Sequence, residues 1–197
     1  VAGVYLYGAY EGGRMNYEKA EKRLSDMNEK DILNDNDYEF LAEIAKSDDM
    51  CIKCDAADLL INYKTKQAVE ILKTLSDDND ATVRASAYDN MWVFEKQDFD
   101  EILRKAVSCE SDGIARSYAI FSLYDLYLQN DCDTAELIDF MHNLYKTEKD
   151  RRCKLQYLRN FYISGETDKL GEIIGYLEDK DYRMRITVVN TISEILN

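Results

Sequence analysis

The chain has 197 residues, of which 39 are acidic and 25 are basic, so its formal net charge at pH 7 is −14. Phosphate backbones and anionic membrane surfaces are bound through cationic side chains, and this charge therefore argues against both as partners. Proline is absent and only eight residues are glycine, which disfavours a sheet protein because its turns need both. No apolar run approaches the roughly 20 residues that span a bilayer.

Residues 1–15 are predicted to form an N-terminal extension, and residues 16–197 a separate domain. The extension holds four of the eight glycines and alternates apolar residues with tyrosines, which favours an extended segment. It lacks the basic region of a signal peptide, and the start at Val1 rather than at methionine is compatible with removal of an upstream piece.

From residue 16 to about residue 33 the pattern predicts a charged helix with one narrow apolar stripe, which suits the end of a stack of helices. Five further segments place apolar residues at i, i+3, i+4 and i+7, the spacing of a helix with one buried face. The first of them is expected to be capped by Asp37, and the others cover residues 66–75, 98–107, 133–146 and 166–177.

A repeated pattern opens five more helices, one after each of these segments. An aspartate is followed four residues later by a base, and an apolar residue precedes the base. The five pairs are Asp49 and Lys53, Asp80 and Arg84, Asp112 and Arg116, Asp150 and Lys154, and Asp181 and Arg185. Successive aspartates are 31, 32, 38 and 31 residues apart, a period typical of stacked repeats. An aspartate at the N-cap satisfies free backbone N–H groups and contributes about 1 kcal/mol, and acid before base is the favourable order on a helix.

This pattern resembles the HEAT and armadillo-like family of helical repeats. The resemblance covers about residues 35–197 and rests on the D-x-x-Φ-[RK] start and on the small residues Ala56, Ala87 and Ala119. It implies an all-α fold, a right-handed α–α superhelix or HEAT-like solenoid of about five helix pairs with an N-terminal cap helix. It also implies that each aspartate caps its helix and each base reaches a neighbouring repeat. The chain lacks the family's usual proline, and Tyr157 stands where alanine is expected.

The cysteines do not predict a metal or redox site. They are odd in number, and Cys51, Cys54 and Cys153 fall in predicted helices near the apolar face, which favours reduced thiols and a cytoplasmic location. Cys51 and Cys54 form a C-x-x-C, but a zinc site needs two more ligands, and there is no second C-x-x-C or histidine pair.

Catalytic patterns are also missing from the sequence. His142 is the one histidine and has no identifiable nucleophile partner. There is no glycine-rich phosphate loop, and the acidic run at 35–39 lacks the glycine and glutamate that a calcium loop needs. We therefore predict a protein that is not an enzyme and that has no catalytic residues, metal ligands or cofactor.

One face of the five capped helices is predicted to bind a partner. With each base as position zero, positions −1, +3, +4 and +7 point into the core, and positions +2, +5 and +9 lie on the opposite, concave face. The predicted partner-binding residues on this face and its shoulder are Asp55, Asp58, Asp89, Trp92, Tyr118, Phe121, Tyr124 and Asp125. Aromatic side chains surrounded by acids are typical of a binding surface for a basic protein. The alternative is that these aromatics pack on neighbouring helices.

The predicted function is therefore a non-catalytic scaffold that binds a basic protein through an acidic, aromatic-containing concave face. Its most concrete version is an immunity protein that inhibits a cationic toxin or nuclease by charge and shape complementarity. The alternatives are a general regulatory adaptor and a HEAT-like enzyme of the lyase or DNA glycosylase type. Because a glycosylase needs a cationic face, the net charge argues against that enzyme. The sequence leaves the oligomeric state open.

Overall fold

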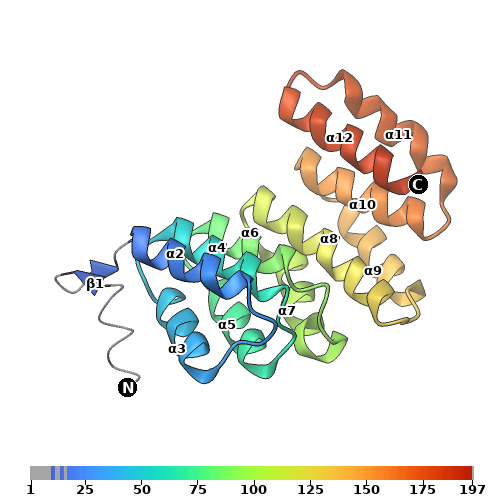
Figure 1. Ribbon diagram of the computed structural model, residues 1–197. Coiled ribbons are helices and arrows are strands. Elements are labelled where there is room, and N and C mark those ends of the chain that lie inside the picture. Colours follow the sequence, from blue (N-terminus) through green and yellow to red (C-terminus); the bar gives the residue numbers. More distant parts are fainter. Residues whose placement is uncertain (1–9, 12–13, 16, 197) are drawn as a thin grey trace. The chain divides into compact units, whose positions relative to one another are not determined.

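The protein is described by a computed structural model that covers residues 10–11, 14–15 and 17–196 (Figure 1). About three quarters of this part of the chain is helical, which confirms the all-α class. Two short strands, β1 (Tyr10–Glu11) and β2 (Arg14–Met15), pair antiparallel at the start. The rest of the predicted extension, residues 1–9 and 12–13, lies outside the described residues. The chain divides into two compact units, Val1–Phe94 and Glu95–Asn197.

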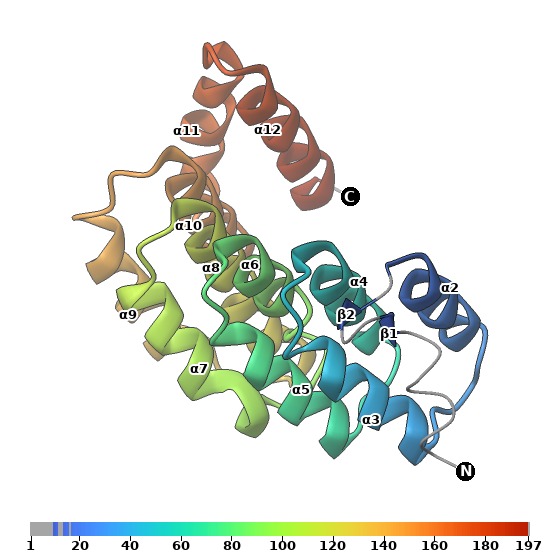
Figure 2. The same cartoon turned by 90° about the vertical axis from the view of Figure 1, so that its left-hand side faces the viewer.

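The first unit consists of two layers of helices. Its helices are α2 (Tyr17–Asn28), α3 (Asp35–Ile44), α4 (Met50–Leu60), α5 (Lys66–Ser76) and α6 (Ala81–Asp89). Helix α4 packs against both α2 and α6, while α3 and α5 contact each other and lie in the second layer (Figure 2). The core between the layers contains the fully buried side chains of Phe40, Ile44, Ile52, Leu60 and Leu72.

Two boundaries of the first unit differ from those predicted. Helix α2 ends at Asn28 rather than near residue 33. The N-cap of α3 is Asn34 and not Asp37. The Asn34 side chain accepts a hydrogen bond from the Asp37 backbone N–H (3.2 Å), and the Asp37 carboxylate accepts one from the Asn34 N–H (3.1 Å). This reciprocal capping box places Asp37 inside the first turn, where it also binds the ammonium of Lys30 at 2.8 Å.

The second unit is built around α8 and α10. Its elements are α7 (Lys96–Cys109), α8 (Gly113–Gln129), α9 (Ala135–Tyr145), α10 (Arg151–Ile163), η1 (Thr167–Lys169), α11 (Leu170–Gly175), η2 (Tyr176–Glu178) and α12 (Tyr182–Ile195). Helix α8 packs on α7 and α10, and α10 also contacts α9, α11 and α12. The helix predicted over 166–177 is broken into η1, α11 and η2. Two glycines, Gly171 and Gly175, weaken it, since each lowers helix propensity by about 1 kcal/mol relative to alanine.

The predicted aspartate caps are confirmed in all five helices. Each aspartate has an extended backbone conformation, and its carboxylate accepts the backbone N–H two residues later. The capping residues are Asp49, Asp80, Asp112, Asp150 and Asp181. The core positions are confirmed in α4, α6, α8 and α10, where every side chain at −1, +3, +4 and +7 is buried. Tyr157 fits where alanine was expected because it packs edge-on against Tyr145 at 6.0 Å in an aromatic cluster.

The bases of the repeated pattern hold the turns that precede their own helices. The guanidinium groups of Arg84, Arg116 and Arg185 each donate a hydrogen bond to a backbone carbonyl six residues earlier, at 2.8, 2.6 and 2.7 Å. These carbonyls belong to acidic residues two positions before the capping aspartates. The side-chain carboxylates of the same residues, Asp78, Glu110 and Asp179, accept the N–H of the capping aspartate, as does that of Glu148.

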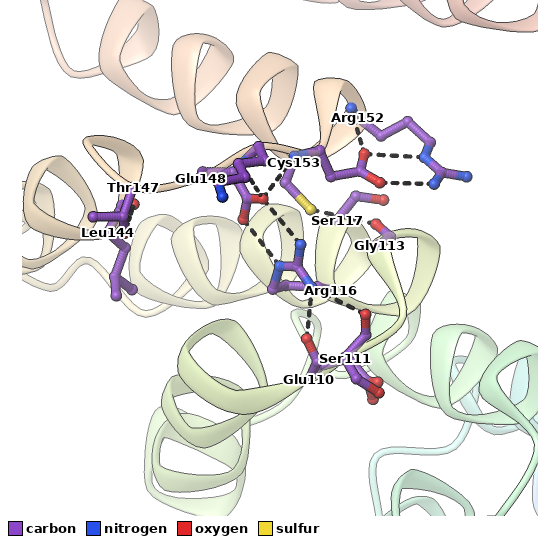
Figure 3. A network of polar contacts seen from close by, with 12 residues as sticks. Glu110, Ser111, Gly113, Arg116, Ser117, Leu144, Thr147, Glu148, Arg152 and Cys153 are labelled. Atoms are coloured by element: carbon purple, nitrogen blue, oxygen red, sulfur yellow. Dashed lines mark hydrogen bonds and ion pairs between the residues drawn. The ribbon is translucent and has the colours of Figure 1, made fainter.

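Three of these acids, Asp78, Glu148 and Asp179, also receive a base from the preceding capped helix. Lys53 of α4 binds Asp78 at 2.7 Å. Arg116 of α8 binds Glu148 through two bonds of 2.9 Å, as Figure 3 shows. Arg151, rather than Lys154, makes the equivalent contact to Asp179. Lys53 and Arg116 thus reach the next repeat, as the resemblance implied, whereas Lys154 lies over the Tyr145 ring at 5.8 Å.

Gly113 at the start of α8 provides a test of this packing. A methyl group at Gly113 would lie 2.0 Å from Oδ2 of Asp150, so the carboxylate that caps α10 would have to move. Gly113→Ala should therefore lower the free energy of unfolding by about 1–2 kcal/mol in urea denaturation.

The matched control is Gly171→Ala in α11, where nothing lies within 4 Å of the added methyl group. This variant should be neutral or more stable by up to about 1 kcal/mol, because alanine favours the helix. Equal effects of the two substitutions would contradict the close approach of Asp150 to Gly113.

Candidate protein-binding surface

The exposed side of α4 carries two of the predicted acids. Asp55 and Asp58 are exposed and lie three residues apart, on the same side of the helix. Oδ1 of Asp58 accepts hydrogen bonds from Oγ of Ser86 and from Nδ2 of Asn90, both at 2.9 Å. Ser86 of α6 and its C-cap Asn90 therefore hold the Asp58 carboxylate of α4 in place, through neutral donors that leave its charge unchanged.

The carboxylate of Asp55 lies near other carboxylates of the first unit. Burial raises the pKa of the Asp55 carboxyl above its ordinary value, and the nearby carboxylates of Asp58, Glu21 and Asp49 raise it further. No cation among the described residues is found to oppose these effects on Asp55. A carboxylate surrounded by other carboxylates is strained electrostatically, because like charges disfavour ionisation.

An exposed aromatic ring belongs to the same surface. Tyr17 at the start of α2 is 40% exposed, and Glu21 raises the pKa of its phenol most, followed by burial and by Asp55. We refer to Tyr17, Glu21, Asp49, Asp55 and Asp58 as the α2–α4 acidic face. The sequence pattern missed Tyr17 and Glu21 as site residues, because only the packing of α2 against α4 brings them beside Asp55.

Most other partly buried acids have a base beside them. Burial alone would raise the pKa of Asp78 and of Glu148, but the pKa of each is held below its ordinary value by the Lys53 and Arg116 side chains. Asp37 likewise binds Lys30 at 2.8 Å. The α2–α4 acidic face differs from these ion pairs because its negative charge remains available to a partner.

Two further predicted residues in the first unit are less accessible. Asp89 at the end of α6 and Trp92 in the turn that follows are both half-buried. They contribute part of their surface to solvent, and the prediction that they bind a partner stays a prediction.

In the second unit, the prediction that Asp125 is an accessible acid beside the exposed ring of Phe121 is wrong. Arg159, predicted on the solvent side of α10, is only 3% exposed. Its guanidinium lies 4.4 Å from the centre of the Phe121 ring and donates to Asp125 at 2.8 and 3.1 Å. Phe121 is therefore half-buried, and Asp125 is paired with a cation of its own unit. Burial still raises the pKa of Asp125, against the opposing effect of Arg159.

The two tyrosines predicted in α8 have different environments. Tyr118 is 39% exposed, as expected. Tyr124 is 1% exposed and belongs to the core, so its predicted place on the shoulder of the surface is wrong. The burial of Tyr124 comes from the packing of α8 against α7 and α10, which the pattern within one helix does not contain.

The candidate metal and catalytic residues are placed as follows. Cys51 is exposed and Cys54 half-buried on α4, so Cys51 is not near the apolar face as predicted, whereas Cys153 is buried. Over the part of the chain that the structure describes, no three His, Cys, Asp or Glu side chains are arranged to hold a metal ion. His142 stacks on Phe161 at 3.9 Å and contacts Glu166 at 2.6 Å, which ties the segment after α10 to α9.

Comparison with known proteins adds no identity. No family model matches the chain, and a search of curated proteins finds no match. Among the helices of the described residues, none is both long enough and apolar enough to cross a membrane.

The electrostatic repulsion at Asp55 can be measured through its effect on the free energy of unfolding. The pKa of Asp55 is raised in the folded protein, so its ionised form destabilises the fold at pH values above that pKa. Asp55→Asn should therefore raise the free energy of unfolding at pH 7, by roughly 0.3 kcal/mol because the group is exposed and screened. The gain should shrink as the pH falls and the wild-type carboxyl takes up a proton, and also as salt is added.

Asp139→Asn on α9 removes the same charge from an exposed acid and is the control. It should change the stability little, because surface substitutions away from specific contacts usually do. A loss of stability in Asp55→Asn at pH 7 would contradict the interpretation that repulsion from nearby carboxylates destabilises the ionised form of Asp55.

Proposed function

We propose that this chain is a non-catalytic binding protein that takes a cationic protein partner on the α2–α4 acidic face. The observation that carries the proposal is the group of exposed carboxylates Glu21, Asp55 and Asp58, where no cation among the described residues is found to offset the mutual repulsion at Asp55. Most of the partly buried acids elsewhere are paired with a base, as at Asp78 and Glu148. A basic partner that docks on this face would relieve the repulsion and gain the attraction of several carboxylates at once.

The face offers a basic protein both opposite charge and an exposed aromatic ring. The net charge of −14 attracts a basic protein over a distance and speeds its encounter. Tyr17 supplies an exposed ring next to the acids, and tyrosine is among the side chains enriched where binding energy is concentrated. An immunity or inhibitor protein that neutralises a cationic toxin or nuclease is the most concrete form of this proposal.

The proposal includes an architecture, in which five helix pairs and a cap helix form one right-handed HEAT-like solenoid in the cytoplasm. Support comes from the aspartate cap that opens five helices and from the contacts of Lys53 and Arg116 to the next repeat within each unit. All five cysteines are free thiols, which suits a reducing compartment.

Small-angle scattering tests this architecture. A solenoid of this length should have a radius of gyration clearly above the roughly 16 Å of a compact 197-residue domain. The measurement should be made on the monomer, at the lowest concentration that gives a usable signal. A monomer with a value near 16 Å would contradict the extended stack.

Charge reversal tests the binding face. In Glu21→Lys/Asp55→Lys the association rate with an arginine- and lysine-rich peptide should fall by about tenfold or more at low salt, because steering depends on local charge. The rate is measured by stopped-flow fluorescence or biosensor kinetics over a salt series. The same pair of substitutions applies to any toxin or nuclease that is tested as the natural partner.

The matched control is Glu136→Lys/Asp139→Lys, which reverses two exposed acids on α9 and gives the same net charge. It should retain most of the association rate. If both double variants lose the same fraction of the rate, binding follows net charge alone and the proposed face is wrong.

A further inference from the structure

The last helix, α12, exposes a row of apolar side chains. Tyr182, Ile186, Val189 and Leu196 are 57%, 54%, 56% and 58% exposed. Their spacings of 4, 3 and 7 residues place them on one face of the helix, opposite the buried side chains of Met184, Val188 and Thr191. A helix with two apolar faces is expected where both faces are covered, and the row spans about 21 Å along the helix axis.

The equivalent positions of α10 show what covers such a row. Leu155 and Leu158, one and four residues after Lys154, are completely buried. They form a core cluster with Ile173 of α11 and with Met184 and Val188 of α12. Ile186 and Val189 stand one and four residues after Arg185, in the same register. In α10 these positions are covered by the helix pair α11 and α12 that follows it. In α12 the same positions are exposed.

We propose that a second copy of this chain covers the α12 row, with the two α12 helices packed antiparallel about a two-fold axis at Val189. Val189 lies midway between Tyr182 and Leu196, so an antiparallel arrangement sets the Tyr182 end of one row against the Leu196 end of the other. All the apolar side chains of both rows then become buried together. A surface that meets itself about a two-fold axis is the commonest form of protein dimer.

Opposite charges lie on the same side in the antiparallel orientation. Arg183 and Glu194 are 11 residues apart, which places them on the same flank of the row to within about 20°. In an antiparallel pair about Val189, Arg183 of each copy lies on the same side and at nearly the same height as Glu194 of the other, whereas a parallel two-fold pair would place the two copies of this flank on opposite sides of the interface. The Glu194 side chain is 45% exposed although it also pairs with Arg159, so it is accessible to a second cation. Antiparallel helix dipoles add a small attraction.

The test is the mass of the particle in solution. Light scattering after size exclusion, at concentrations up to about 200 µM, should give twice the chain mass of 22.9 kDa. Val189→Glu places a charge at the centre of the row and should return the mass to that of one chain, with an unchanged helical circular dichroism spectrum. Ile32→Glu is the control, because Ile32 is 82% exposed outside the row, and this variant should keep the wild-type mass.

Cross-linking tests the geometry without relying on a disruptive variant. In Val189→Cys the two-fold axis brings the two new thiols together, so mild oxidation should give a disulfide between two copies of residue 189, identified by peptide mass spectrometry. Wild-type protein treated alike accounts for the native cysteines. A wild-type monomer over the whole concentration range, or a dimer that survives Val189→Glu, would overturn the proposal. So would a dimer without the 189–189 disulfide, which would place a different surface against the row.

Discussion

The fold of each unit depends on how the carboxylates between paired helices are satisfied. The carboxylate of each capping aspartate accepts hydrogen bonds from backbone N–H groups of the helix that follows. In four of the five turns, an acid two residues earlier binds the N–H of that aspartate, and in Asp78 and Glu148 it also binds a base from the previous capped helix. One short turn thus satisfies a helix start and joins two helices in space. The chain can carry these acids in its turns because each of them accepts a hydrogen bond from a defined donor.

Because most partly buried acids have a base beside them, an acid for which no base is found needs a different explanation. At Glu148, burial would raise the pKa, and the bidentate contact with Arg116 lowers it instead. At Asp55, burial and the neighbouring carboxylates act in the same direction, and both raise the pKa. The first arrangement stabilises the fold at neutral pH, whereas the second works against it. A surface that retains such a cost is better explained by recognition of a cation than by stability, and this is the basis of the proposed function.

In the second unit, Arg159 determines whether the acid Asp125 is available to a partner. Arg159 has an apolar ring on one side and two carboxylates around its guanidinium, and it is almost completely buried. It therefore belongs to the interior of this unit, and it removes Asp125 from the set of acids that a partner could use. A buried, fully paired arginine of this kind fixes the relative position of α8, α10 and α12, since each contributes a group that contacts it or carries it.

The sequence by itself determined the helical class, the starts of the five capped helices and the buried face of four of them. These features depend on local chemistry, because an aspartate reaches only the next turn and helical periodicity involves neighbours three or four residues apart. The tertiary structure decided which surface residues are available. Tyr124 is buried in the core of the second unit, and Phe121 is covered by Arg159 from 38 residues away. It also decided that Tyr17 and Glu21 lie beside Asp55 and that the outer row of α12 is uncovered. Burial and the electrostatic field depend on what another helix places nearby, and no local pattern of residues contains that information.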